Sequence, residues 1–222
     1  MKFLLTAINA KFIHSNPAIY SLRAGVGEKL QPYVELAEFT INESLESILE
    51  GIWKRQPKVI GFSCYIWNWK LIREILTELP KILPNTEIWL GGPEVTYDGP
   101  GLLSEFPQVT GIMVGEGEVT FREVLGQYVR EAESTGQSEQ QPEPDSIEQQ
   151  AADRTGTVTG KTVAERFGQI PGLCLASGYT APRELTDLTT LPFLYEDMEP
   201  FTNRIIYYET SRGCPYRCSY CL

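Results

Sequence analysis

The feature that most constrains the fold of this chain is a regular alternation of short apolar runs and amphipathic segments over residues 1–130. The runs have the length of buried strands, and the segments between them repeat apolar residues at helical spacing. Apolar strands joined by helices form parallel sheets that are covered on both faces. The sequence therefore predicts an α/β fold, namely a flavodoxin-like (Rossmann-like) doubly wound sheet of five parallel strands. The expected strands cover residues 3–8, 34–41, 59–62, 88–90 and 112–114.

Three glycine-containing segments lie at the ends of expected strands and mark the place where a ligand would bind: Gly61–Tyr65, Gly91–Glu94 and Gly115–Glu118. In doubly wound sheets, ligands bind beyond the carboxyl ends of the strands, near the point where the strand order reverses. Glycine lets backbone amides approach such a ligand without obstruction by a Cβ atom, although turn geometry alone would also explain each glycine. The candidate binding residues in the segments after the strands are His14, Ser63, Cys64, Tyr65, Gly91, Gly92, Pro93, Glu94, Gly115, Glu116, Gly117 and Glu118.

Composition divides the chain into four parts. The α/β domain is expected over residues 1–133. Residues 134–162 are rich in Gln, Glu, Ser, Thr and Gly and contain almost no large apolar residue, which predicts an acidic, disordered linker. Residues 163–203 are expected to form a connector that contains one short strand. The last part, residues 204–222, is expected to begin with a strand over 204–210 and ends in three cysteines.

Three of the five cysteines lie close together at the end of the chain, with the spacing C-x3-C-x2-C: Cys214, Cys218 and Cys221. An odd total with such crowding is not typical of a disulfide framework. Thiolates are the preferred ligands of iron–sulfur clusters, and three of them in a tight loop leave one iron of a cubane cluster open. Structural zinc sites favour C-x2-C pairs and four protein ligands, and the single histidine, His14, is not adjacent to the cysteines. The spacing therefore favours an iron–sulfur cluster over zinc.

The run from Glu209 to Cys221 (ETSRGCPYRCSYC) resembles the cluster loop of the radical S-adenosylmethionine (radical SAM) superfamily. The glycine turns upstream resemble those of the cobalamin-binding domain that precedes this loop in one large branch of the superfamily. The resemblance implies that cobalamin binds to the α/β domain and that Cys214, Cys218 and Cys221 hold a [4Fe-4S] cluster. It further implies that the open iron binds S-adenosylmethionine, with Tyr220 beside the adenine.

The resemblance also implies an activity. In the resembling enzymes cobalamin carries a methyl group, the product is often a methylated carbon, and electrons come from a reductant such as ferredoxin or flavodoxin. The barrel that shapes the substrate pocket would follow Cys221, and this sequence stops at Leu222. We therefore expect the chain to bind cobalamin without turnover on its own, and no residue is assigned a catalytic role. A stand-alone cobalamin-binding module is the alternative.

The segment after the first strand departs from the best-known cobalamin-binding motif. That motif, D-x-H-x-x-G, supplies an axial histidine, whereas the segment Asn9–Asn16 (NAKFIHSN) lacks both the aspartate and the glycine. Without the aspartate, a ligating imidazole has no second partner that orients it. We therefore expect base-off cobalamin without histidine ligation, and His14 as a hydrogen-bonding loop residue near the corrin.

Several of the singled-out residues also have a purely structural explanation. Glu116 and Glu118 fit the first turn of a helix, where acidic side chains complement the helix dipole. Cys64 and Cys174 fit core packing, since a free cysteine behaves as a small hydrophobic residue. Two aromatic residues fit either a cover over the cofactor or the core. They are Trp67 and Trp69.

Charge and hydropathy argue against several other classes of protein. The formal net charge is −10, whereas a nucleic-acid surface needs clustered Lys and Arg. No apolar run is long enough to span a bilayer, so we expect no membrane partner and a cytoplasmic location. A receiver-like signalling domain shares this fold but needs acidic residues after the first strand and an aspartate after the third. The chain has Asn9-Ala10-Lys11 and Ser63-Cys64-Tyr65 at these places.

Overall fold

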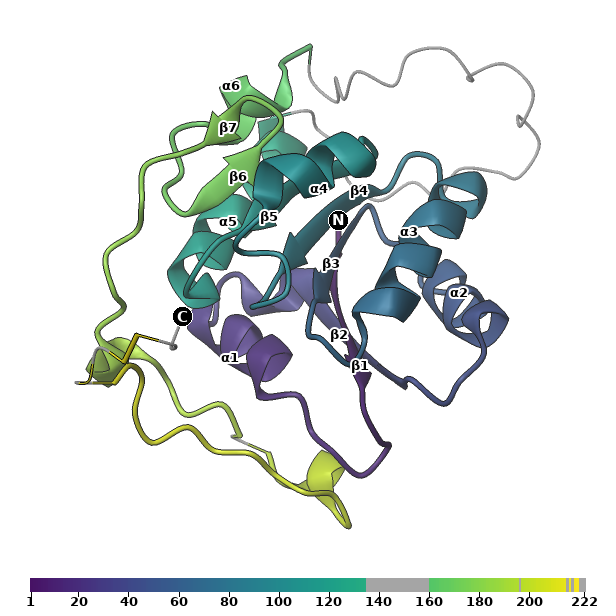
Figure 1. The fold of residues 1–222 in the computed structure, drawn as a ribbon, viewed down its shortest axis with the longest axis vertical. Coiled ribbons are helices and arrows are strands. Elements are labelled where there is room, and N and C mark those ends of the chain that lie inside the picture. Colours follow the sequence, from purple (N-terminus) through teal and green to yellow (C-terminus); the bar gives the residue numbers. More distant parts are fainter. Residues whose placement is uncertain (135–159, 196, 215, 217, 220–222) are drawn as a thin grey trace.

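The computed structural model describes residues 1–134, 160–195, 197–214, 216, 218 and 219, and its centre is a seven-stranded sheet (Figure 1). Five of the strands are parallel, in the order β2-β1-β3-β4-β5. This order reverses between β1 and β3 and confirms the predicted flavodoxin-like, doubly wound sheet. The parallel strands are β1 (Phe3–Asn9), β2 (Val34–Thr40), β3 (Val59–Ser63), β4 (Glu87–Gly91) and β5 (Val109–Met113).

Helices cover both faces of this sheet. One face carries α1 (Pro17–Gly25) and α5 (Gly117–Ser134), and the other carries α2 (Leu45–Trp53), α3 (Trp69–Ile82) and α4 (Gly99–Glu105). Among the described residues, no helix combines the length and the apolar character that crossing a bilayer requires. Short 3-10 helices occur at η1 (Gln31–Tyr33), η2 (Leu188–Thr190) and η3 (Glu199–Phe201).

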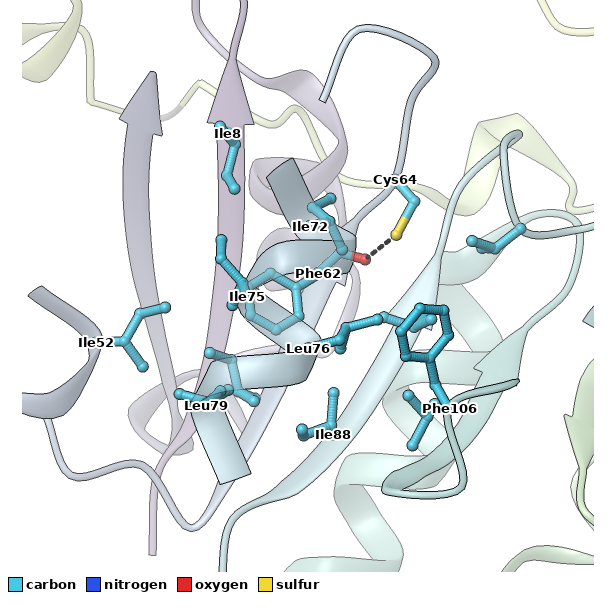
Figure 2. Packing of buried hydrophobic residues seen from close by; sticks show 14 of the residues in the cluster. Ile8, Ile52, Phe62, Cys64, Ile72, Ile75, Leu76, Leu79, Ile88 and Phe106 are labelled. Carbon is cyan, nitrogen blue, oxygen red and sulfur yellow. Dashed lines mark hydrogen bonds between the residues drawn. The ribbon is translucent and has the colours of Figure 1, made fainter. Parts of the chain in front are cut away.

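The two sides of β1 show why its sequence is apolar at nearly every position. Successive residues of a strand point to opposite faces of the sheet. Phe3, Leu5 and Ala7 pack with the buried side chains of α1 and α5, whereas Leu4 and Ile8 pack in the layer beneath α2 and α3. Figure 2 shows this second layer, in which isoleucines and leucines of α3 cover the central strands. The strand is buried on both sides, which is the environment that its apolar sequence predicts.

An antiparallel hairpin extends the sheet beyond β5. Its strands are β6 (Leu173–Leu175), which confirms the short strand predicted in the connector, and β7 (Gly178–Tyr179). Before it lies α6 (Val163–Phe167), a helix that the sequence pattern did not predict because it is only five residues long. A capping box between Thr162 and Glu165 starts α6. The connector is therefore packed onto the α/β domain through α6 and the hairpin.

The strand predicted over residues 204–210 is not formed. Ile205 makes one isolated parallel bridge with His14, which lies in the loop after β1. Because this loop is not itself a strand, the pairing has no regular partner along which to continue. Residues 197–212, which we call the strap, instead run as an irregular segment past the loop after β1, drawn in yellow in Figure 1.

Candidate functional site

Four neighbouring strands end at one edge of the sheet, which we call the carboxyl edge. Ser63 of β3 pairs with Gly91 of β4, and Gly91 pairs with Met113 of β5. The parallel strand β1 lies on the other side of β3. The segments that follow the strands therefore leave the sheet at the same edge, as the sequence predicts. They are residues 10–16, 64–68, 92–98 and 114–116.

The backbone of Gly92 is fixed by the close approach of two of these turns. Its φ is +110°, and a Cβ atom on it would lie 2.5 Å from the carbonyl oxygen of Cys64. The turn after β4 thus rests on the turn after β3, and chain geometry alone requires glycine here. Gly115 also has a positive φ, +78°, but a Cβ atom there would meet no atom within 4 Å. The space beside Gly115 is therefore open, whereas the protein itself fills the space beside Gly92.

The other two candidate glycines lie where elements meet. Gly91 ends β4, and a Cβ atom on it would make ordinary contact with Met113, 3.7 Å away. Gly117 begins α5, and a Cβ atom on it would lie 3.0 Å from the side chain of Leu22 in α1. Gly117 therefore allows α1 and α5 to pack closely, while Gly91 is under no such constraint.

A pocket of about 400 Å³ lies between the turns after β3 and β4. Three predicted residues, Tyr65, Pro93 and Glu94, come together in its wall. The ring of Trp67 stacks on that of Tyr65, with 4.4 Å between the ring centroids and 6° between the planes. The pocket therefore combines flat aromatic surface with one carboxylate. Its complete lining is Tyr65, Ile66, Trp67, Pro93, Glu94 and Tyr97.

Three residues with a possible structural explanation pack in or beside the core: Cys64, Cys174 and Trp69. Cys64 and Cys174 are fully buried, as predicted, and the Cys64 thiol donates a hydrogen bond of 3.6 Å to the carbonyl oxygen of Phe62 (Figure 2). Burial raises the pKa of both thiols, which keeps them protonated and poorly nucleophilic. Trp69 packs against the ring of Phe106 beside the core. Trp67, by contrast, lines the pocket.

His14 is held by the strap. Its Nδ1 atom shares a hydrogen bond with the hydroxyl of Tyr207, and the two rings stack with 5.5 Å between their centroids. The neighbouring backbone is also engaged, since the Ser15 amide donates to the carbonyl oxygen of Ile205 over 3.0 Å. His14 is therefore a hydrogen-bonding loop residue, as predicted, whereas its position near the corrin stays a prediction. The strap partner, Tyr207, could not be identified from local sequence.

The acidic pair at the start of α5 binds the strap and the connector. Arg212 donates two hydrogen bonds, of 2.5 and 3.1 Å, to the buried carboxylate of Glu118, and the Ser21 hydroxyl donates a third of 2.7 Å. Burial alone would raise the pKa of Glu118, but these hydrogen bonds outweigh it and hold the pKa below its usual value. Glu116 accepts a hydrogen bond from the Thr186 amide. Both carboxylates thus have partners within the chain.

Asn68 is a structural residue of the site that the sequence analysis missed. Its side chain is fully buried, and Nδ2 donates to the carbonyl oxygens of Ile8 and Ser63 over 3.0 and 2.9 Å. Its Oδ1 atom accepts from the amide of Tyr65 over 2.8 Å. Both N–H groups and the carbonyl oxygen of the Asn68 side chain are therefore hydrogen-bonded, and they join the ends of β1 and β3. An asparagine just before a helix was the available signal, but it indicates a cap rather than these partners.

The predicted cluster ligands are only partly covered by the structure. Cys214 and Cys218 follow the strap in sequence and are exposed. Cys221 and Tyr220 lie outside the described residues. Within the described part of the chain, no group of three His, Cys, Asp or Glu side chains is placed to hold a metal ion. The assignments of Cys214, Cys218, Cys221 and Tyr220 therefore remain predictions.

The fold and the site define a class of protein. A parallel sheet in the order 2-1-3-4-5, with glycine turns and an aromatic pocket at its carboxyl edge, is a flavodoxin-like ligand-binding domain. The family model of the B12 binding domain matches residues 4–125, which is more than half of the chain. The chain therefore belongs to the B12-binding domain family.

Two curated relatives show which proteins carry similar domains. The cobalamin-dependent radical SAM methyltransferase TokK of Streptomyces tokunonensis is 26% identical over 186 residues, covering 75% of this chain and 22% of TokK. The 2-(S-pantetheinyl)-carbapenam-3-carboxylate methyltransferase of Streptantibioticus cattleyicolor is 28% identical over 188 residues, covering 81% of this chain and 24% of the relative. The chain thus spans about a quarter of the length of the curated relatives that it matches.

A solved structure supports the fold. The cobalamin-dependent S-adenosylmethionine radical enzyme OxsB aligns with a TM-score of 0.62 and 16% identity, over 98% of this chain and 28% of that chain. At this level of identity the similarity concerns the fold. It agrees with the doubly wound arrangement derived above.

Proposed function

We propose that this chain is the cofactor-binding part of a cobalamin-dependent radical SAM methyltransferase. Residues 1–133 bind cobalamin at the carboxyl edge. Cys214, Cys218 and Cys221 hold a [4Fe-4S] cluster, and S-adenosylmethionine binds to its open iron with Tyr220 beside the adenine.

The observation that carries the proposal is the set of large apolar side chains exposed on three loops of the carboxyl edge. Soluble proteins seldom gather such side chains on one surface unless something binds there. Phe12 follows β1 and is 73% exposed, Ile66 follows β3 and is 81% exposed, and Tyr97 follows β4 and is 68% exposed. A corrin ring is a wide, mostly apolar plate. Ile66 and Tyr97 line the aromatic pocket that would receive it, and Phe12 lies on the loop after β1, beside Arg204. The open space beside Gly115 adds room for a bulky ligand.

The residues of the chain have distinct parts in this proposal. Tyr65 and Trp67 supply the flat surface for the corrin, and Pro93 and Glu94 bound it on the β4 side. His14 Nδ1 and the hydroxyl of Tyr207 share a hydrogen bond, and His14 is placed beside the corrin as a loop residue without axial ligation. When bound, cobalamin supplies a methyl carrier and the cluster with S-adenosylmethionine supplies a radical initiator. A one-electron donor such as ferredoxin or flavodoxin is the partner that this chemistry requires.

Retention of cobalamin tests the first half of the proposal. The purified chain is mixed with hydroxocobalamin, desalted, and its visible spectrum recorded. We expect the chain to retain a corrin absorption band. Trp67→Ala should weaken this band, and His14→Ala should leave its wavelength unchanged. Trp53→Ala is the matched control, because Trp53 is 51% exposed against 48% for Trp67 but lies at the end of α2, away from the pocket. Absence of the band from the unaltered chain would refute cobalamin binding.

Anaerobic reconstitution tests the second half. The chain is incubated with ferrous iron and sulfide, and iron content and the charge-transfer absorption of the cluster are measured. We expect about four irons per chain, the value for a cubane, and loss of the absorption in Cys214→Ala with no change in Cys174→Ala, whose thiol is buried in the core. Cobalamin retention without any cluster would instead identify a stand-alone cobalamin-binding module.

A further inference from the structure

The side-chain oxygen of Asn16 is a buried acceptor without a partner at the carboxyl edge. Asn16 is 4% exposed, and its Oδ1 atom accepts no hydrogen bond from any described residue. Its Nδ2 atom donates to Oδ1 of Asn9 and to Oγ of Ser63. Folded proteins pair nearly all of their buried polar atoms, so an unpaired one calls for a specific explanation.

The position of Asn16 is the point where the strand order of the sheet reverses. Asn9 ends β1 and Ser63 ends β3, and these strands are neighbours whose following helices lie on opposite faces of the sheet. Asn16 precedes α1 at the N-cap position, yet its side chain makes no cap hydrogen bond. Nδ2 of Asn16 therefore lies between the two strand ends, at the edge where doubly wound sheets bind ligands.

The hydrogen bonds of Asn16 are loosely held compared with those of Asn68. The two bonds from Asn16 Nδ2 measure 3.3 and 3.4 Å, beyond the usual range for N–H···O bonds, whereas the three bonds of Asn68 lie between 2.8 and 3.0 Å. Asn68 is fully satisfied and serves the fold. Asn16 has one vacant acceptor and two long bonds, so its side chain can reorient at little cost when a donor arrives.

We propose that Asn16 recognises the nucleotide tail of the corrinoid by accepting a hydrogen bond from a ribose hydroxyl. The inference rests on the proposed cobalamin binding and assigns a specificity-determining residue to it. The tail is narrower than the corrin ring, so we place the tail beyond the carboxyl ends of β1 and β3 and the ring on the exposed loops that carry Ile66 and Tyr97. Ribose hydroxyls are donors in the tail, which suits an unpaired carbonyl oxygen.

Paired titrations test this assignment. Dissociation constants for hydroxocobalamin and for cobinamide, which lacks the nucleotide tail, are measured for the unaltered chain and for Asn16→Leu. We expect Asn16→Leu to weaken cobalamin binding roughly three- to tenfold, the value of one lost hydrogen bond, and to leave cobinamide binding within about twofold. Thr6→Val is the matched control, since Thr6 carries another buried, unpartnered oxygen but lies within β1, and it should change neither constant.

The other outcomes are decisive as well. Equal weakening of both corrinoids would overturn the inference, because it would indicate a contact to the corrin ring or damage to the fold. Unchanged binding of both corrinoids, together with higher thermal stability of Asn16→Leu, would also overturn the inference. It would indicate that no ligand reaches Oδ1 of Asn16, or that only water binds there. If the unaltered chain binds cobalamin but not cobinamide, the tail contributes most of the affinity. The dissociation constants for cobalamin then decide: weaker binding by Asn16→Leu supports the inference, and equal binding overturns it. If the unaltered chain binds neither corrinoid, the proposed function itself fails.

Discussion

Residues at the carboxyl edge fall into two groups. Contacts within the chain explain the first group, and we attribute the second to the ligand that we propose. Gly92, Asn68 and Cys64 have their conformation, hydrogen bonds or burial explained by contacts within the chain. Gly115 and Asn16 do not, since one borders open space and the other keeps an unpaired oxygen. Substitutions at the first group should therefore affect stability, and substitutions at the second should chiefly affect binding.

Alanine substitutions at two glycines test this division. Gly92→Ala should lower the free energy of unfolding by about 3 kcal/mol, because it adds both a positive-φ penalty and a clash with the Cys64 carbonyl. Gly115→Ala should cost only about 1 kcal/mol, because its penalty is conformational alone. Urea denaturation followed by circular dichroism measures both values. Equal losses would contradict the close packing of the two turns.

At the scale of elements, two parts outside the parallel sheet are fastened to it by charged groups. Helix α6 inserts Arg166 between Glu87 of β4 and Glu131 of α5, and its guanidinium is fully buried. The strap is fastened near its middle by an ion pair between Arg204 and Glu38, and at its end by one between Arg212 and Glu118. Removing only one partner of a hydrogen-bonded ion pair of this kind strongly lowers the free energy of unfolding.

Removal of the α6 arginine should be strongly destabilising. Arg166→Met removes the buried guanidinium that donates to the carboxylates of Glu87 and Glu131, which should cost about 3 kcal/mol of the free energy of unfolding. Arg130→Met on α5 is the control, because Arg130 is exposed, and it should change stability by less than about 0.5 kcal/mol. Chemical denaturation gives both values, and a similar small effect for the two variants would show that α6 is not anchored in this way.

The Glu118–Arg212 contact should make the fastening of the strap sensitive to acid. The pKa of Glu118 in the folded chain lies below its usual value of about 4.3. The ionised carboxylate therefore stabilises the folded chain above that pH, and this contribution is lost as the pH falls through the lower folded pKa. Glu118→Gln should cost about 2 kcal/mol near pH 7, a value typical of charge-assisted hydrogen bonds, and progressively less below about pH 4.

Unfolding free energies of the unaltered chain and Glu118→Gln, measured from pH 7 to pH 3, give this difference directly. The same comparison in an Arg212→Gln background is the control and should show a much smaller pH dependence, because the main partner that lowers the pKa is gone. A difference that stays constant with pH would contradict the assigned contact.

At the scale of the whole molecule, the carboxyl edge is where the α/β domain and the strap meet. The strap contacts the loop after β1 through Ile205 and the start of α5 through Arg212. Cys214 follows Arg212 by two residues, so the contact with α5 also restricts where the cysteine-containing end begins. A ligand on this edge would lie close to both parts of the chain.

Cobalamin should therefore stabilise the whole chain. With ligand at one hundred times its dissociation constant, binding to the folded state alone adds about 2.7 kcal/mol, which for a chain of this size raises Tm by roughly 5–10 °C. Thermal denaturation with and without hydroxocobalamin measures the shift, and Trp67→Ala at the same concentration should show a smaller one. An unchanged Tm at concentrations that saturate the corrin spectrum would contradict binding to the folded domain.

The sequence by itself determined the parallel sheet, the helices that cover it and the edge at which the candidate site residues lie. These features depend on local patterns, since strand burial is encoded in apolar runs and helix faces in the spacing of residues such as Phe121, Val124 and Leu125. The positions of the glycine turns follow from the same patterns, because the carboxyl ends of parallel strands share one edge.

Only the tertiary structure decided which partners these residues have. His14 meets Tyr207 across 193 residues of sequence, and Glu118 meets Arg212 across 94. No local pattern encodes such pairings, because they depend on how the connector and strap pack once the sheet has formed. The same reason explains the misassigned strand over 204–210, whose apolar residues met a loop instead of a sheet edge. The unpaired oxygen of Asn16 likewise results from the positions that packing gives to Asn9 and Ser63.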